Sequence, residues 1–269
     1  QLELLEAHGP ARVVAWLKID TGMHRLGIAP SECQEYLDRL GACVSVKEVR
    51  LMTHLANADR NADPKTAAQA SLFRSALAGF EGAISFANSA ALLGTDEVLD
   101  SISAESSNVW VRPGIAIYGI SPFPGRTGTD LGLRAVMEFQ SRLVAVKPVS
   151  VGETVGYGGT WRANSDTVIG IVSAGYGDGY SRFLPSGTPV LVAGRRVPLV
   201  GIVSMDLLAV DLGAGAGDKV GDRVILWGDG LPVEEVAAAA GTIAYQLVSG
   251  VTYREPGVAV SGDSRSSTS

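Results

Sequence analysis

The sequence predicts an α/β protein: the C-terminal part of a (β/α)8 TIM-type barrel, followed by a mostly antiparallel β domain. Strand-like and helix-like segments alternate in the first half of the chain, which is typical of a parallel sheet. Charged and glycine-rich segments follow these strands, as in barrels that collect their chemistry at the strand C-termini. From Val136 onward, short β-branched runs with turn residues between them indicate an antiparallel domain.

The first half of the chain contains four strand-like runs. We expect strands at residues 13–19, 44–53, 83–87 and 109–111. The segment before the first run is typical of a helix end that leads into a strand. Because a barrel needs eight strands to close, four units predict that the N-terminal half of the barrel is absent from this chain.

Helix signals lie between these runs. Ser31 and Gln34 form a capping-box pattern, and Gly41 provides a stop signal. Asp63 precedes Pro64, which predicts a helix that begins at the proline. Helical periodicity predicts that the buried face of this second helix comprises Leu72, Phe73, Ala76, Leu77 and Phe80.

Composition shifts divide the chain. Residues 121–133 are rich in proline and glycine and lack periodicity, which is typical of an interdomain connection. We therefore predict a partial TIM-type barrel at residues 1–128, a C-terminal β domain at 129–258 and a disordered tail at 259–269. In the β domain, the one clear helix signal covers residues 233–240.

Composition also limits the function. The 269 residues are 46% hydrophobic, and a net charge of −6 argues against a nucleic-acid surface, which needs clustered positive charge. No apolar run reaches the length of a membrane span, so we expect no membrane partner. Cys33 and Cys43 lack CxxC spacing, which favours reduced thiols and a cytoplasmic protein. Three histidines without clustered ligands give no support to a metal site.

One stretch, WLKIDTGMHRLGIAP at residues 16–30, organises the first half. An apolar run ends there in a charged turn, in which Gly22 and Gly27 permit sharp changes of direction. Its polar side chains lie within eight residues of one another: Lys18, Asp20, Thr21 and Arg25. Alone, such a segment is as consistent with an ordinary surface turn as with a site.

Two aromatic-glycine segments stand out in the second half. Tyr157 lies in VGYGGTW, and Tyr176 lies in AGYGDGY. Flanking glycines permit close approach to a ligand, although plain turns are the commoner reason for such a pattern.

Together these segments resemble the alanine racemase family. The block from Lys18 to Gly27 matches the family's K-x-D-T-G-M-x-R-x-G segment. The SMD at Ser204 and GTIAYQ at Gly241 are similar to its S-M-D and G-T-I-N-Y-E elements. The matches run in the family's order from Lys18 to about Pro256. The resemblance implies an enzyme that interconverts L-alanine and D-alanine with pyridoxal 5'-phosphate (PLP), supplying D-alanine for peptidoglycan.

The resemblance also implies roles for residues that would hold the cofactor. Arg112 would face the pyridine nitrogen of PLP, and His54 would lie between Arg112 and Tyr157 in a hydrogen-bonded chain. The residues implied to hold the phosphate are Ser89, Gly114, Ile115 and Tyr245. From the residues alone, His54 is more readily a structural histidine, and Ser89 is also consistent with a helix cap.

The remaining implied roles concern the amino acid substrate. Tyr157 would be the catalytic base on one face of the substrate, and Tyr176 would lie near it. Arg25 and the backbone of Met205 would receive its carboxylate. Lys18 resembles a lysine that is often carbamylated, although it is also consistent with a solvated charge.

This chemistry is physically coherent. The α proton of an amino acid is too weakly acidic for a side chain to remove unaided, so a cofactor must delocalise the resulting charge. A tyrosine with an ordinary pKa near ~10 needs neighbouring positive charge to act as a base, which Arg25, or His54 backed by Arg112, would supply.

The sequence departs from the family at several positions. The family's PLP lysine lies in a V-x-K-A-N-A-Y-G-like segment, and none of the five lysines here has that context, so we expect this chain alone to be inactive. Ile202 replaces a usual arginine, and Ala244 and Gln246 replace Asn and Glu beside Tyr245. In this family the tyrosine of one subunit faces the PLP lysine of the other, which implies a homodimer with a shared site.

Other functions remain open from the sequence. One is a racemase of serine or another amino acid. Another is a non-catalytic remnant of the fold, and a PLP-dependent decarboxylase fits the segments around Tyr157 and Met205 less well.

Overall fold

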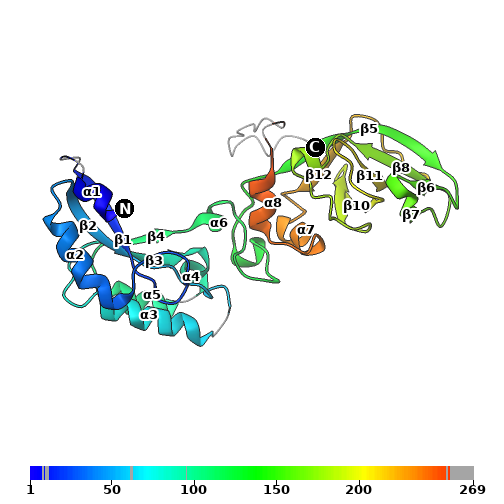
Figure 1. Cartoon of the computed structure of the whole chain (residues 1–269). Helices are drawn as coiled ribbons and strands as arrows, with labels where there is room; N and C mark the ends of the chain where they lie inside the picture. The colour runs from blue at the N-terminus through cyan, green and yellow to red at the C-terminus, as the bar shows by residue number, and fades with distance from the viewer. Residues whose placement is uncertain (8, 10–11, 61–62, 95, 253, 255–269) are drawn as a thin grey trace. The chain divides into compact units, whose positions relative to one another are not determined.

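The computed structural model describes residues 1–7, 9, 12–60, 63–94, 96–252 and 254. The chain forms two compact units, which divide between Leu133 and Arg134 (Figure 1). The tail predicted at residues 259–269 lies outside the described residues.

The first unit contains a four-stranded parallel sheet, as the sequence predicts. Its strands, in both chain order and spatial order, are β1 (Val13–Lys18), β2 (Val46–Met52), β3 (Ile84–Asn88) and β4 (Val109–Arg112). The helical elements are α1 (Leu2–Ala7), η1 (Pro30–Glu32), α2 (Cys33–Ala42), α3 (Pro64–Ala76), α4 (Ser89–Gly94), α5 (Asp96–Ser103) and α6 (Gly114–Ile117). Each strand therefore ends at the same edge of the sheet as its neighbours.

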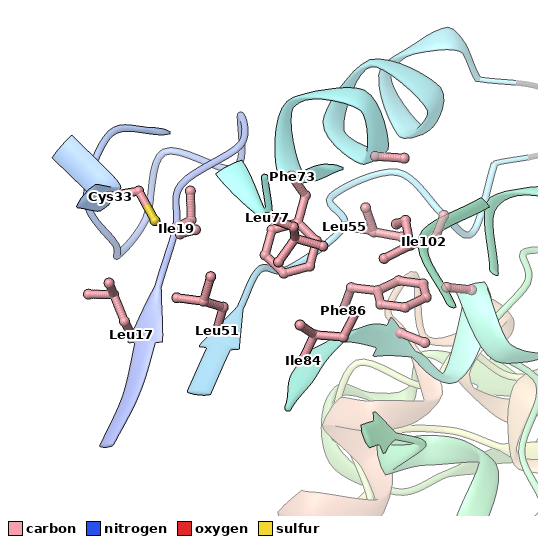
Figure 2. Packing of buried hydrophobic residues seen from close by; sticks show 14 of the residues in the cluster. Leu17, Ile19, Cys33, Leu51, Leu55, Phe73, Leu77, Ile84, Phe86 and Ile102 are labelled. Atoms are coloured by element: carbon pink, nitrogen blue, oxygen red, sulfur yellow. The ribbon is translucent and has the colours of Figure 1, made fainter. Parts of the chain in front are cut away.

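One face of this sheet packs on helices. Leu17, Leu51 and Ile84 are register partners on adjacent strands. They belong to the same buried cluster as Phe73 and Leu77, of which Phe73 is fully buried (Figure 2). Because side chains alternate along a strand, the next residue of each strand points to the opposite face.

Three local predictions in this unit are wrong. Leu72 of α3 is 46% exposed, because it lies one position off the buried row. The capping box before α2 does not use Ser31 and Gln34: the backbone N–H of Ala29 donates to Glu32 Oε2 at 2.8 Å, so the first turn starts earlier. Gly41 does not stop α2, which continues to Ala42.

The second unit is an antiparallel β barrel. Its closed strand order is β10 (Arg195–Val200), β11 (Leu208–Asp211), β8 (Thr167–Val172), β5 (Phe139–Val149), β12 (Arg223–Trp227) and β9 (Pro189–Val192). A hairpin of β6 (Thr154–Val155) and β7 (Trp161–Arg162) accompanies it, with the 3-10 turns η3 (Tyr157–Gly159) and η4 (Tyr176–Asp178). A further turn, η2 (Thr129–Leu131), lies near the end of the first unit. The antiparallel prediction is confirmed.

Two further helices lie in the described part of the second unit. Helix α7 (Val233–Ala239) is the one that the sequence indicates. Helix α8 (Ala244–Gly250) was not predicted, because it is only 7 residues long and three of them, Val248, Ser249 and Gly250, are weak helix formers. Packing of Ala244 and Leu247, both buried, stabilises it instead. Among the described residues, no helix combines the length and apolar character that a membrane span requires.

Candidate active site

Hydrogen bonds hold the loop after β1 in a compact turn that returns to the end of the strand. The Asp20 carboxylate accepts N–H groups from Gly22 at 2.9 Å, Met23 at 3.0 Å and His24 at 3.0 Å. The loop returns to the strand end because Ile28 N–H donates to the Lys18 carbonyl at 2.9 Å. The backbone hydrogen bonds, with His24 first, hold the pKa of Asp20 below its ordinary value. This anchoring fixes the segment that carries Arg25, whose side chain is exposed.

Glycine is required where this loop closes. Gly27 has φ +125°, and a Cβ there would lie 2.9 Å from the Asp20 nitrogen and 3.0 Å from the Lys18 carbonyl oxygen. The turn predicted around Gly27 is therefore confirmed, with close backbone approach as its physical reason.

Arg112, at the end of β4, is held by three partners. Its guanidinium donates to the Thr53 carbonyl at 2.7 Å and to Ser85 Oγ, and it lies 3.4 Å from His54 Nδ1. Burial lowers the pKa of Arg112. The structure thus brings His54 and Arg112 within 3.4 Å of each other, which is one of the two contacts that the resemblance implies for His54.

The surrounding charge is positive. Burial, followed by Arg112, Lys18 and Arg25, lowers the pKa of His54 from 6.5 to about 4. The pKa of Lys18 is also lowered, first by burial and then by Arg25 and Arg112, against an opposing effect of Asp20. His54 is therefore neutral at pH 7, and the region favours an anionic ligand.

Ser89 lies beside the segment that contains Gly114 and Ile115. Its hydroxyl accepts the backbone N–H of Ala116 at 3.2 Å, and Ser89 is buried. The side chain of Asn88, rather than that of Ser89, accepts the Ala91 N–H at 3.0 Å and caps α4. Three of the predicted phosphate residues are thus collected at the ends of β3 and β4.

In the second unit, Tyr157 lies on the turn η3 between β6 and β7. Gly158 beside it has φ +70°, and the Tyr157 side chain is 67% exposed. The hairpin approaches the barrel closely, because a Cβ on Gly201 would lie 2.8 Å from the Val155 carbonyl oxygen.

Tyr176 and Met205 lie on two adjoining turns. Tyr176 N–H donates to the Ser204 carbonyl at 3.0 Å, and Gly177 N–H donates to the Met205 carbonyl at 2.8 Å. The Met205 side chain is 52% exposed. Tyr245 lies at the start of α8 and is 44% exposed.

Several residues that support these sites were missed in the sequence. Arg254 donates to Asp206 and lies 3.6 Å from the buried Asp178, whose carboxylate accepts the Gly175 N–H at 2.9 Å. No spacing signal in the sequence identifies this network. Gln69 was also missed, although it lies four and eight residues before Phe73 and Leu77 and so shares their buried row.

Polar side chains at the ends of parallel α/β strands, followed by an antiparallel β barrel with exposed tyrosines, define a class of two-domain enzymes. Two family models divide the chain in the same way. The N-terminal domain of alanine racemase matches residues 1–122, and its C-terminal domain matches residues 136–259. The chain belongs to the alanine racemase family, whose members are PLP-dependent isomerases.

Individual relatives agree. The chain is 52% identical over 259 residues to an alanine racemase of Aliivibrio salmonicida, covering 94% of this chain and 69% of that protein. It is 50% identical over 256 residues to that of Vibrio cholerae, with the same coverage. The crystal structure of biosynthetic alanine racemase from Pseudomonas aeruginosa gives a TM-score of 0.85 at 44% identity, covering 95% of this chain and 70% of that one.

Proposed function

We propose that this chain binds PLP with its first unit and, in a homodimer of the complete gene product that also supplies the PLP lysine missing from this sequence, interconverts L-alanine and D-alanine. The contact between Arg112 and the neutral His54, at 3.4 Å and next to Lys18, is the observation that carries this proposal. A second copy would supply the opposite face of the site.

The donor set fits a phosphorylated pyridine. Ser89 and the backbone around Gly114 and Ile115 would hold the phosphate, together with Tyr245, because hydroxyl and N–H groups suit phosphate oxygens. Positive charge from Arg25 and Arg112 favours the anion.

When bound, PLP supplies the electron sink that stabilises the charge left after the α proton is removed. Arg112 retains its protons at any working pH, so it would donate a hydrogen bond to the ring nitrogen without transferring a proton. Its place is fixed by Thr53 and Ser85, which hold the guanidinium from two strands.

Tyr157 would remove or return the α proton on one face of the substrate. Its exposed hydroxyl-bearing ring is accessible, and Arg25 or Arg112 would supply the positive charge that stabilises the phenolate. His54 does not supply it at pH 7, because the histidine is neutral there. Arg25 and the Met205 backbone would receive the substrate carboxylate, with Tyr176 beside it.

Lys18 would be carbamylated. Its lowered pKa increases the neutral amine, which is the form that adds carbon dioxide, and the resulting anion would complement Arg25 and Arg112.

Assembly and location belong to the same proposal. Exposed Tyr157, Phe183 and Met205 in the second unit, with Phe183 at 87%, favour a covering second copy. Cys33 and Cys43 are free and buried, which is consistent with a reducing cytoplasm, where D-alanine for peptidoglycan is made.

The test uses the complete gene product and its Tyr157→Phe variant. We expect PLP absorbance that survives dialysis in both, and a kcat for alanine about 10²–10⁴-fold lower in Tyr157→Phe, since a general base contributes that much. Tyr36→Phe on α2 is the matched control and keeps wild-type kcat. Full activity of Tyr157→Phe contradicts the assignment of the base. If the protein turns over serine but not alanine, serine replaces alanine as the proposed substrate. If it neither retains PLP nor turns over an amino acid, it is a non-catalytic remnant of the fold.

A further inference from the structure

Gln69 is a buried polar residue in the middle of α3. Only 1% of it is exposed, and it lies on the same helix row as the core residues Phe73 and Leu77. A glutamine in an apolar row costs free energy unless its amide is fully hydrogen-bonded. Its partners therefore show why it is tolerated.

The Gln69 amide joins two strand ends. Its Nε2 donates to Thr21 Oγ1 at 3.3 Å and to the His54 carbonyl at 3.1 Å. Its Oε1 accepts the Ala56 N–H at 2.8 Å. Donor and acceptor sides are both used, which an aliphatic side chain or a carboxylate cannot reproduce.

Both partners lead to the candidate site. Thr21 lies in the loop that carries Arg25, and its hydroxyl is 2.8 Å from that of Thr53. The Thr53 carbonyl in turn accepts from Arg112 at 2.7 Å. One buried amide thus connects the loop proposed to receive the substrate carboxylate with the residues proposed to contact the cofactor ring.

We propose that Gln69 is a positioning residue that fixes the Arg25 loop against the end of β2 and so sets the places of His54 and Arg112. The inference deepens the proposed function and rests on it. Gln69 itself touches neither substrate nor cofactor in this assignment.

The test compares Gln69→Met, which keeps the volume but loses the hydrogen bonds, with Thr21→Val, which removes one partner. Ala70→Gly, the next position of α3 and also buried, is the control for helix destabilisation. Two quantities are measured: the pKa of His54, by NMR in protein freed of cofactor, and KM for alanine.

In Gln69→Met, we expect the proton affinity of His54 to rise at least tenfold. Loosening of the β2 end admits water and moves the imidazole away from Arg112, Lys18 and Arg25, the charged groups that lower its pKa. KM for alanine should rise about fivefold or more in Gln69→Met and in Thr21→Val. Ala70→Gly should lower Tm by a similar amount but keep the wild-type His54 pKa and the wild-type KM.

An unchanged His54 pKa in Gln69→Met, with KM unchanged in both variants, overturns the proposal and leaves Gln69 a purely structural residue. Should Gln69→Met fail to fold, KM in Thr21→Val decides. The pKa of His54 is measured without cofactor, so it tests the role of Gln69 whether or not PLP binds. Absence of PLP binding in the wild-type protein would refute the proposed function alone.

Discussion

Buried side chains at the strand ends of the first unit and exposed side chains on the turns of the second unit are held in place by different means. In the first unit, Ser89, Thr53 and Gln69 are each no more than 3% exposed and are held by side-chain hydrogen bonds at strand ends. In the second, Tyr157 and Met205 are 67% and 52% exposed and depend on the backbone of glycine-rich turns.

The difference predicts how each unit responds to substitution. Where side chains hold one another, replacing a single one alters both stability and the site. Where backbone turns carry exposed side chains, replacing the side chain alters chemistry alone, and replacing a packed glycine alters the fold.

The largest effect that tests this contrast is expected for Gly175→Ala. A Cβ there would lie 2.2 Å from the Ser204 carbonyl oxygen and 2.3 Å from that of Met205, and both carbonyls already accept backbone N–H groups. The free energy of unfolding should fall by about 3 kcal/mol. Urea unfolding measures it, with Gly217→Ala, where nothing lies within 4 Å, as control. Equal stability of the two variants would show that the backbone at Ser204 and Met205 shifts to accommodate the added Cβ, and would contradict the prediction.

A smaller effect is expected from pH in the first unit. The pKa of His54 is about 4 in the folded protein against 6.5 ordinarily, so the unfolded chain binds more protons between these values. The free energy of unfolding should therefore fall as pH decreases from 6.5 to 4, by about 2 kcal/mol once solvent screening is allowed for.

His54→Asn isolates this contribution, since carboxylates titrating near pH 4 remain in both proteins. Hydrogen exchange at pH 7, 5.5 and 4 separates the units, and the second unit contains no histidine. The same pH dependence in wild type and His54→Asn would contradict the depressed pKa.

The smallest effect concerns the network around Tyr176. Asp178 is buried and accepts the Gly175 N–H, so Asp178→Ala should cost about 1 kcal/mol of unfolding free energy. Asp206, whose side chain is 57% exposed, pairs with Arg254 at the surface, so Asp206→Ala should cost about 0.3 kcal/mol. Thermal unfolding compares the two, and the reverse order would mean that the surface pair dominates.

Short-range signals in the sequence were sufficient for several elements. Asp63 before Pro64 predicted the start of α3, and the Asp63 carboxylate accepts the Lys65 N–H at 2.9 Å. Helix α8 and the buried position of Gln69 escaped prediction. The sequence of α8 contains weak helix formers, and Gln69 is polar, so neither signals burial locally. The contacts that stabilise both come from other segments of the chain.

By itself, the sequence determined the alternation of strands and helices and the position of Lys18, His54 and Arg112 near strand ends, because hydrophobic periodicity is local. Only the tertiary structure decided which side chains meet. Arg112 and Thr53 are separated by 59 positions, yet the guanidinium reaches that carbonyl, since parallel strand pairing brings their ends together. The neutral state of His54 was likewise decided by burial and by charges from other strands.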